Sequence, residues 1–450
     1  MSLPTFHIRT YGCQMNERDS EAAACTLAAE GFRPAATEAE AKILLFNTCS
    51  VRDQAERKVL GKLGILKKRK KTEPDLVIGV FGCMAQRLGE ELREEIGHVD
   101  LVVGTDQLHR LPQLLREVLA THNGAVAVER GGGPEEMEFM GRHQPGGRAA
   151  FVAVMRGCNQ GCTYCIVPEV RGREKSRPIP EIVEEVRGLA ISGVQEITLL
   201  GQNITAYGVA EARKQPGGWD QTTSPFAELL RAVCEVPGIL RLRFTSPHPA
   251  YMNAAFVQAL AELPKVCDHL HIPMQSGADR ILGLMRRGYT AAAYLERIRA
   301  IQAVRPGMAF STDIIVGFPG ETDAEFAATR EVMETVGFDM AYIFKYSPRP
   351  GTVADKMPDD VPQVVKEQRL ALLLADLDQR VLAHNKAIVG QTVEVLVEGP
   401  SLRNPLRWCG RTGTHKMAIF DPLPGLVAGT LARITVERGT AHSLFGQLVG

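Results

Sequence analysis

Short apolar runs alternate with amphipathic segments in the first part of this 450-residue chain. Buried strands are predicted at residues 6–11, 41–46, 75–81 and 100–103, and each is followed by a segment with helical periodicity. Strands separated by helices pair in parallel, because each helix carries the chain back to the end of the sheet where the previous strand began. The pattern therefore predicts an α/β protein that begins with a doubly wound parallel sheet.

The same strand–helix unit recurs six times after residue 148. Its strands are predicted at 149–155, 196–200, 240–245, 269–273, 309–316 and 340–346. Six units are too few to close a barrel of eight strands, but they suffice for a partial (β/α)6 barrel. An open barrel leaves one side available for a large substrate.

Two other segments depart from this pattern. Residues 131–147 are rich in glycine and proline, which predicts a linker or an ordered surface loop. The carboxy-terminal segment alternates apolar and polar residues and carries seven Lys or Arg against four Asp or Glu, which predicts a small antiparallel β-barrel that binds nucleic acid or serves as a cap. The predicted division is an amino-terminal domain at 4–123, a linker at 124–148, a central domain at 149–382 and a β domain at 384–450.

The composition is that of a folded protein with a sizeable core. Apolar residues make up 45% and charged ones 23%, and no apolar run approaches the roughly 20 residues that cross a bilayer. The 52 basic and 52 acidic residues exclude a globally basic nucleic-acid binder, but not a local basic patch. Because the start of the chain has no secretory signal, we expect a cytoplasmic protein whose clustered cysteines bind metal or do chemistry.

Cys158, Cys162 and Cys165 lie in one predicted loop after the first barrel strand. A zinc site usually has four ligands and no fourth Cys or His is nearby, so a zinc loop would have to be completed from elsewhere. Three thiolates leave one iron of a cubane cluster open, and an open iron is what a chelating small molecule requires. The motif therefore predicts an iron–sulfur cluster with a vacant position.

Cys13, Cys49 and Cys83 are distant in sequence, yet each directly follows a predicted strand of the first sheet. The carboxyl ends of parallel strands share one edge, so these cysteines are expected to converge there. Gly12 and Gly82 precede two of them and would let the backbone approach an inorganic centre. A second cluster with one open iron is predicted, and three unrelated buried cysteines are the alternative.

Three further features have both functional and structural interpretations. The run KKRKK at 67–71 is a solvated helix end or a phosphate contact. His269 and His271 lie on one predicted strand, and only one of them is expected to face the barrel interior. The remaining cysteines have no metal-like spacing and are expected to pack as apolar residues; they are Cys25, Cys234, Cys267 and Cys409.

The spacing Cys158-Asn-Gln-Gly-Cys162-Thr-Tyr-Cys165 resembles the cysteine loop of the radical S-adenosylmethionine (SAM) superfamily. A narrower resemblance is to the methylthiotransferases of that superfamily. Its amino-terminal signatures are YGCQMNERDS, FNTCSVRDQAERK and GCMAQR, and its later ones are LLGQNITAYG, SPHP, LHIPMQSGADRILGLMRRGYT, STDIIVGFPGET and FKYSPRPGT. The β tail is similar to the family's TRAM domain, an RNA-binding module. The residues around the amino-terminal cysteines resemble the branch of the family that acts on tRNA.

This resemblance implies two 4Fe–4S clusters, one on each group of three cysteines, with SAM on the unique iron of the second. Tyr164 stands where the superfamily has an aromatic residue beside the adenine of SAM. Other candidate SAM contacts follow or lie in the barrel strands, and each is otherwise a turn residue; they are Gln202, Asn203, Ser246, Gln275, Ser276 and Asp313. Three arginines after the cysteine loop would meet phosphate or the SAM carboxylate, or are solvated; they are Arg171, Arg173 and Arg177.

The implied activity is methylthiolation of carbon 2 of N6-dimethylallyladenosine at position 37 of tRNA, next to the anticodon, with two SAM molecules. One SAM would methylate a sulfur at the amino-terminal cluster, and the other would yield a radical that takes hydrogen from the base. An aromatic C–H has no useful acidity, so acid–base chemistry cannot replace the radical. The expected partners are tRNA and a reducing electron donor; no membrane is expected, and the chain is expected to be a monomer.

Two other functions are weighed against this one. The first, in the same class, modifies a ribosomal protein. The second is a non-catalytic RNA-binding protein whose cysteines hold structural zinc. Iron and sulfide analysis separates the second from both enzymes.

Overall fold

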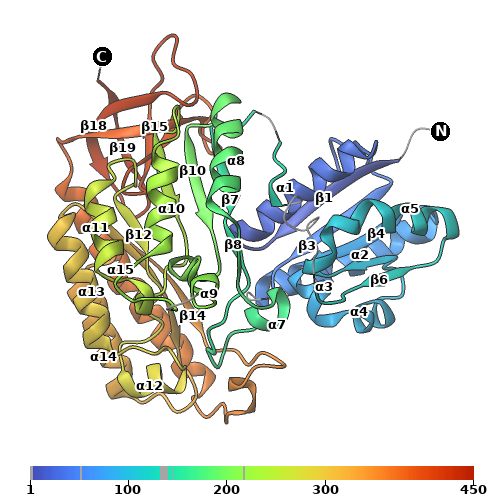
Figure 1. The fold of residues 1–450 in the computed structure, drawn as a ribbon, viewed down its shortest axis with the longest axis horizontal. Coiled ribbons are helices and arrows are strands. Elements are labelled where there is room, and N and C mark those ends of the chain that lie inside the picture. The colour runs from blue at the N-terminus through green and yellow to red at the C-terminus, as the bar shows by residue number, and fades with distance from the viewer. Residues whose placement is uncertain (1–3, 51–52, 132–139, 145, 216–217, 450) are drawn as a thin grey trace.

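Six parallel strands form the amino-terminal sheet, in the order β2–β1–β3–β4–β5–β6 (Figure 1). The computed structural model describes residues 4–50, 53–131, 140–144, 146–215 and 218–449. The strands of this sheet are β1 (Thr5–Tyr11), β2 (Arg33–Pro34), β3 (Ile43–Thr48), β4 (Val77–Gly82), β5 (Leu101–Val103) and β6 (Ala125–Ala127). All neighbouring pairs are parallel, which confirms the predicted doubly wound sheet.

Helices cover both faces of this sheet, because its central strands are apolar on both sides. Two helices pack on one face, α1 (Gln14–Ala29) and α5 (Leu111–Thr121). Three pack on the other, α2 (Asp53–Thr72), α3 (Cys83–Leu88) and α4 (Glu90–Glu95). The chain therefore leaves β1 and β3 toward opposite faces, and the carboxyl ends of these two neighbours mark the switch point at which such a sheet has its crevice. Sheets of this kind bind their ligands in that crevice.

Strand β6 lies in the segment that the sequence assigned to the linker. It pairs in parallel with β5, with Leu101 opposite Ala125, and so belongs to the amino-terminal sheet. Three residues beside glycines give little local signal, and it is the pairing with β5 that makes them a strand. Of the predicted linker, residues 132–139 and 145 lie outside the described residues.

The central domain is an open barrel of six strands. Its two parallel sheets, β7–β10–β11 and β12–β13–β14, are joined by a bridge between Leu242 and Val266. The strands are β7 (Ala149–Ala153), β10 (Glu196–Leu200), β11 (Arg241–Phe244), β12 (His269–His271), β13 (Ala309–Val316) and β14 (Met340–Lys345). The larger helices on the outside are α8 (Ile179–Ile191), α10 (Pro225–Cys234), α11 (Ala254–Glu262), α13 (Ala291–Val304), α14 (Asp323–Val336) and α15 (Gln363–Ala387). All six predicted strands are present, which confirms the partial (β/α)6 barrel.

The tail is a closed barrel in the order β15–β16–β17–β19–β18, and β18 pairs back with β15. Its strands are β15 (Thr392–Pro400), β16 (Trp408–Thr412), β17 (Met417–Phe420), β18 (Leu431–Gly439) and β19 (Leu444–Leu448). Four of its pairings are antiparallel, as predicted. The fifth pairing, between β17 and β19, is parallel. In the closed barrel β19 lies between β17 and β18, and it is antiparallel to β18.

The turn between β16 and β17 docks this small barrel onto the amino-terminal ends of the central strands. Arg241 Nη1 donates to the Arg411 carbonyl at 2.6 Å, and Arg243 Nη2 donates to the Thr412 carbonyl at 2.8 Å. The ring of His415 stacks on that of His269 at 4.9 Å between centroids. At the other end, Ala153 of β7 and Leu200 of β10 pack in the core of the amino-terminal domain. No helix in the described ranges has the length and apolarity that crossing a membrane requires.

Two candidate cysteine centres on either side of one helix

Cys13, Cys49 and Cys83 lie at the carboxyl ends of three adjacent strands, β1, β3 and β4. Cys13 is the residue before α1, and the Cys49 amide donates to the Tyr11 carbonyl at 3.0 Å. Cys83 begins α3, directly after Gly82. The first two thiols hydrogen-bond each other, and Cys13 is close enough to Cys83 to affect its pKa. The structure therefore brings together the three cysteines that the sequence placed after strands.

A buried amide pair forms the floor beneath these cysteines. Asn16 Nδ2 donates to Asn47 Oδ1 at 2.9 Å, and Asn47 Nδ2 donates to the Asn16 carbonyl at 2.8 Å. A Cβ at Gly82 would lie 2.3 Å from Asn47 Oδ1, and Gly82 has a φ of 94°, so no other residue fits there without strain. Gly82 and the two asparagines thus fix where the chain enters α3, and with it the position of Cys83.

One buried cation lies beside this group. Arg171 Nη2 contacts Asp19 Oδ2 at 2.7 Å, and both side chains are almost fully buried. The hydrogen bond with Cys49, followed by the charge of Arg171, lowers the pKa of the Cys13 thiol to about 5. Burial raises the pKa of Cys83, and Arg171 opposes that effect. The surroundings therefore favour at least one thiolate, the form of cysteine that binds iron.

The second group lies in the loop between β8 (Met155–Arg156) and α7 (Val167–Arg171). The Cys158 amide donates to the Gly172 carbonyl at 3.1 Å, and the Thr163 hydroxyl donates to the Leu284 carbonyl at 2.9 Å, at the end of α12 (Asp279–Leu284). These bonds hold both ends of the loop. Cys158 is buried, while Cys162 and Cys165 are partly exposed.

Arg287 is the cation of this second group. Its Nη1 donates to Cys162 Sγ at 3.2 Å, its Nε donates to the Tyr289 hydroxyl at 3.1 Å, and only 6% of the residue is exposed. Burial raises the pKa of Cys158 to about 12 and that of Cys165 to about 11. Both thiols are therefore neutral near pH 7 in the protein alone, and each would release a proton on binding iron.

The residues present fit iron–sulfur clusters better than single metal ions. Among the described residues, no group of three or more His, Cys, Asp or Glu is placed to hold one metal ion. In a cubane cluster each cysteine binds a different iron, so its thiolates stand farther apart than the ligands of one ion. Two groups of three thiols that are not placed around a single ion are compatible with that chemistry. That these six cysteines are the cluster ligands remains a prediction.

Helix α7 connects the two groups. It begins two residues after Cys165, and Val170 packs with Ile166 against Cys83. The Thr105 hydroxyl donates to the Val170 carbonyl at 2.6 Å, which fastens the helix to the amino-terminal domain. Both groups of cysteines thus lie at the contact between the sheet and the barrel, with one group before the five-residue helix and the other packed against it.

The predicted SAM contacts lie around the carboxyl ends of the barrel strands. Ser246 and Gln275 follow β11 and β12 with positive φ values of 59° and 72°, a strained conformation for residues other than glycine that is typical of ligand sites. Gln202 Oε1 is buried with no hydrogen-bond partner in the described part of the chain, as expected of an atom that awaits a ligand. Tyr164 lies edge-on to Phe318 at 6.5 Å between ring centroids.

The other three predicted contacts have protein neighbours. Asn203 is buried near Glu174, yet its Oδ1 and Nδ2 have no hydrogen-bond partner in the described residues. Ser276 is fully buried, and its hydroxyl accepts from the Ala278 amide at 3.2 Å. Asp313 lies within β13 rather than at its end, and its carboxylate contacts His271 Nε2 at 3.3 Å. For Ser276 and Asp313 the turn and core interpretations account for the contacts that the structure shows, whereas Asn203 has two buried polar atoms that a ligand could satisfy.

His248 is a candidate that the sequence analysis did not single out. Its Nδ1 accepts from the Ala250 amide at 3.3 Å, and its Nε2 is buried with no partner in the described ranges. Burial, followed by the charge of Arg287, lowers the pKa of His248 to about 3, so the ring is neutral and carries its proton on Nε2. It lies 5.6 Å from Tyr289, ring to ring. The segments SPHP and RRGYT contained His248 and Arg287, but nothing in their spacing indicated which residue would face the site.

The arginines after the cysteine loop have three different roles. Arg177 is structural, since its Nη1 donates to the Ala153 carbonyl at 2.8 Å and its Nη2 contacts Glu185 at 2.6 Å. Arg171 is the buried partner of Asp19 described above. Arg173 is exposed. The solvated-loop alternative therefore holds for one of the three.

Two of the expectations for basic residues require correction. In the run 67–71, Arg69 Nη1 donates to the Glu38 carbonyl at 2.8 Å and Lys70 Nζ contacts Asp100 at 2.8 Å, so both hold the fold. His269 and His271 both contact the Ser311 hydroxyl, at 2.9 and 3.0 Å. The expectation that only one of them faces inward was wrong, because residues two apart on a strand share a face.

A partial parallel barrel with three cysteines in the loop after its first strand defines the class of radical SAM enzymes. Residues 152–333 match the radical SAM superfamily, residues 5–104 the family described as uncharacterized protein family UPF0004, and residues 386–449 the TRAM domain. A solved radical S-adenosylmethionine methyltransferase, TsrM from Kitasatospora setae, shares the fold with a TM-score of 0.54 and 15% identity, over 76% of this chain and 73% of its own.

Curated relatives narrow the class. A protein of Moorella thermoacetica named tRNA-2-methylthio-N(6)-dimethylallyladenosine synthase is 46% identical over 99% of this chain and 98% of its own length. A protein of Opitutus terrae with the same name is 44% identical over 98% of this chain and 97% of its own length. The chain belongs to the family of tRNA-2-methylthio-N(6)-dimethylallyladenosine synthases, and with it to the radical SAM methylthiotransferases that the sequence resembled.

Proposed function

We propose that this protein adds a methylthio group to carbon 2 of N6-dimethylallyladenosine at position 37 of tRNA, with two SAM molecules and two 4Fe–4S clusters. The family supplies the reaction. The observation that carries the proposal for this chain is the placement of two three-cysteine groups at α7, one before the helix and the other packed against it. A reaction that needs both a sulfur carrier and a radical source in one cavity requires such proximity.

The two groups of cysteines would have different roles in the reaction. Cys158, Cys162 and Cys165 would hold the cluster whose electron cleaves SAM, while Cys13, Cys49 and Cys83 would hold the one that carries the transferred sulfur. Arg287 places a positive charge beside Cys162, and Arg171 places one beside the amino-terminal group of cysteines. Cys49, Cys83 and Cys158 are buried, which limits the access of water to each group and would protect a radical from side reactions.

The remaining candidates bind and orient SAM. Gln202 presents an unpaired buried oxygen to an amine or hydroxyl donor, and His248 presents an unpaired buried N–H to an acceptor. Ser246 and Gln275 turn the chain sharply at the ends of two neighbouring strands, and backbone hydrogen bonds to Asp313 and Ile315 fix where the Gln275 side chain leaves the strand. Tyr164 supplies an aromatic face for the adenine.

The partners follow from the same proposal. The tail domain contributes to tRNA binding, in keeping with its match to the TRAM domain. A reducing electron donor is required, because cleavage of SAM consumes an electron. We further propose that the chain acts as a monomer in the cytoplasm, since the two cysteine groups and the tail come from one chain.

Two measurements on anaerobically purified protein test the function. Iron and sulfide analysis should give about eight of each per chain, the content of two cubane clusters. Incubation with SAM, a reductant and tRNA that carries N6-dimethylallyladenosine should yield the 2-methylthio nucleoside in a digest analysed by mass spectrometry. Zinc without iron would favour the RNA-binding alternative. Two clusters with no modified nucleoside, but with a modified ribosomal protein, would move the chain to the other branch of the family.

A further inference from the structure

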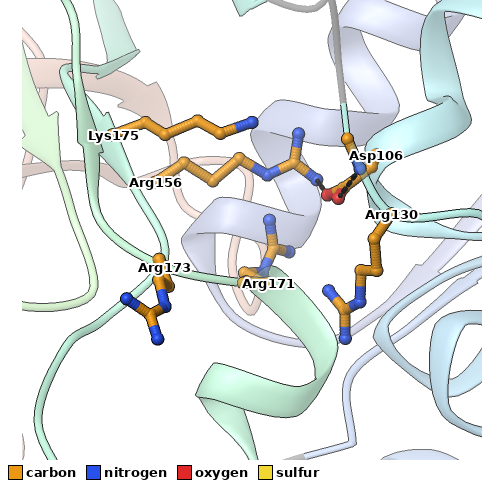
Figure 2. A pocket seen from close by; sticks show the side chains of 8 residues that line it. Asp106, Arg130, Arg156, Arg171, Arg173 and Lys175 are labelled. Carbon is orange, nitrogen blue, oxygen red and sulfur yellow. Dashed lines mark hydrogen bonds and ion pairs between the residues drawn. The ribbon is translucent and has the colours of Figure 1, made fainter.

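A cavity of about 280 Å³ lies at the contact between the amino-terminal sheet and the barrel (Figure 2). Its lining comes from both domains: η1 (Thr105–Arg110) and the segment after β6 on one side, β8, α7 and β9 (Lys175–Ser176) on the other. At roughly 30 Å³ for each water molecule, the space would hold about nine waters. It is therefore large enough for a tetrahedral oxyanion with part of the molecule that carries it.

The charge of the lining is unbalanced. Five of the eight lining residues are basic and one is acidic; the basic ones are Arg130, Arg156, Arg171, Arg173 and Lys175. Asp106 is the only carboxylate among the lining residues, and it lies 3.7 Å from Arg156. Concave surfaces lined by one sign of charge focus the electric field and concentrate ions of the other sign.

The basic residues form a buried floor and an exposed rim. Arg156 and Arg171 are 3% and 5% exposed. Arg156 Nη2 donates to the Thr105 carbonyl, and Arg171 pairs with Asp19, so both are held in place. The other three, Arg130, Arg173 and Lys175, are exposed. Figure 2 shows Arg156 and Lys175 side by side, both directed toward Asp106, with Arg171 between them and Arg130.

Arginine-rich, rigidly held donors are typical of phosphate sites, because the planar guanidinium matches two oxygens of a phosphate at once. The position of the cavity points to the source of that phosphate. Arg171 belongs both to its wall and to the surroundings of the amino-terminal cysteines, and Arg156 precedes Cys158 by two residues. A phosphate bound here would be fixed beside both cysteine groups.

We infer that this cavity binds one phosphodiester of the RNA substrate and thereby positions the target base between the two cysteine groups. The inference rests on the proposed function for the identity of the RNA, while the anion site itself follows from the lining. Arg173 and Arg130 at the rim would capture the phosphate, and Arg156 and Arg171 would fix its orientation.

The test uses the cluster-loaded protein and an anticodon stem-loop in which single phosphodiesters are replaced by neutral methylphosphonates. With the unaltered protein, one linkage near the target base should stand out by weakening binding severalfold. In the double variant Arg130→Gln/Arg173→Gln, binding of the unmodified RNA should weaken, the slope of log K against log salt should fall by about one for each lost phosphate contact, and that linkage should no longer matter. Arg299→Gln, an exposed change on the outer helix α13, is the matched control and should keep the full slope.

Each other outcome overturns the inference. If every methylphosphonate has the same effect on the variant as on the unaltered protein, the cavity contacts no phosphate of the RNA. Titration with inorganic phosphate, followed by ³¹P NMR, tests whether the cavity binds a free anion instead. If the double variant abolishes phosphate binding, and no single phosphodiester of the RNA depends on the two arginines, the cavity is a site for a free anion. Iron content equal to that of the unaltered protein shows that the variant is folded. Conversion of the stem-loop by the unaltered protein is scored separately, so a failure of the proposed function is recognised independently.

Discussion

Arg171 and Asp19 form a buried ion pair of 2.7 Å that ties the helix after Cys165 to the helix after Cys13. Asp19 lies on α1 and Arg171 at the end of α7, 152 residues apart in the sequence. The pair therefore joins the two domains between the helix that follows one group of cysteines and the helix that follows Cys13.

Breaking this pair should destabilise the domain contact. Asp19→Asn leaves the Arg171 charge buried without its partner, which costs about 3–5 kcal/mol in comparable pairs. We expect the free energy of opening of α1, measured by hydrogen exchange on its peptides, to fall by that order. The double variant Asp19→Asn/Arg171→Met removes both charges and should recover part of the loss. Equal protection in the unaltered protein and in both variants would show that the pair contributes nothing to the contact.

The cysteine groups should differ in their effect on SAM. Cys158→Ala should abolish 5′-deoxyadenosine formation, because it removes a ligand of the cluster that reduces SAM. Cys13→Ala should retain SAM cleavage and lose the methylthio product. Chromatography of both products from the same reaction measures the division. Equal loss of the two activities in both variants would contradict it.

Arg287 should set the reduction potential of the second cluster. Its positive charge and its hydrogen bond to Cys162 would stabilise the reduced, more negative form of the proposed cluster. If that stabilisation is about 1.4 kcal/mol larger in the reduced form, Arg287→Met lowers the potential by about 60 mV. A redox titration followed by electron paramagnetic resonance measures the shift. The control is Arg286→Met, a change at the exposed neighbouring residue. If it shifts the potential as much as Arg287→Met does, Arg287 has no special role.

Acid should weaken the docking of the tail domain. Burial lowers the pKa of His415 to about 3, and Arg243, Arg411 and His271 oppose its protonation further. The unfolded chain binds this proton near pH 6.5 and the folded chain does not, so stability falls as the pH drops below 6.5 toward 3.

At pH 5.5, one unit below the pKa of histidine in the unfolded chain, this ring lowers the free energy of unfolding by at most about 1.4 kcal/mol. The thermal midpoint of the protein between pH 7.5 and 5.5 measures it. His415→Gln should reduce the pH dependence by that amount and leave the share of His248 and His269. His442→Gln, an exposed change on the same domain, should leave the pH dependence as it was. The same slope in both variants would place the acid sensitivity elsewhere.

The lysines at the end of α2 offer a separate test of phosphate contact. Lys67, Lys68 and Lys71 are exposed, whereas Arg69 and Lys70 hold the fold. Replacing the three exposed lysines by Gln should reduce the salt dependence of tRNA binding without changing the thermal midpoint. Arg69→Gln should lower the midpoint instead. If the salt slope of the triple variant is unchanged, these lysines contact no phosphate and the solvated-helix interpretation holds.

Local patterns sufficed for much of the fold. The strands 196–200 and 309–316 were predicted to the residue, because their apolar runs are bounded by glycine or by charged residues. β6 was missed because only its pairing with β5 defines it. In the tail, the parallel β17–β19 pair departs from the antiparallel prediction, since strand order in a closed barrel depends on distant partners.

The same division holds for the site. The sequence by itself determined the six cysteines, the strand ends that carry them and the family, because spacing and strand periodicity are properties of short segments. The tertiary structure alone decided which cations stand beside them: Arg171 next to Cys13, and Arg287 next to Cys162. These contacts span more than a hundred residues, and they arise from the packing of α7 and α12 rather than from any pattern near the cysteines. The effect of these arginines on the thiols depends on their burial, and burial is a property of the folded chain.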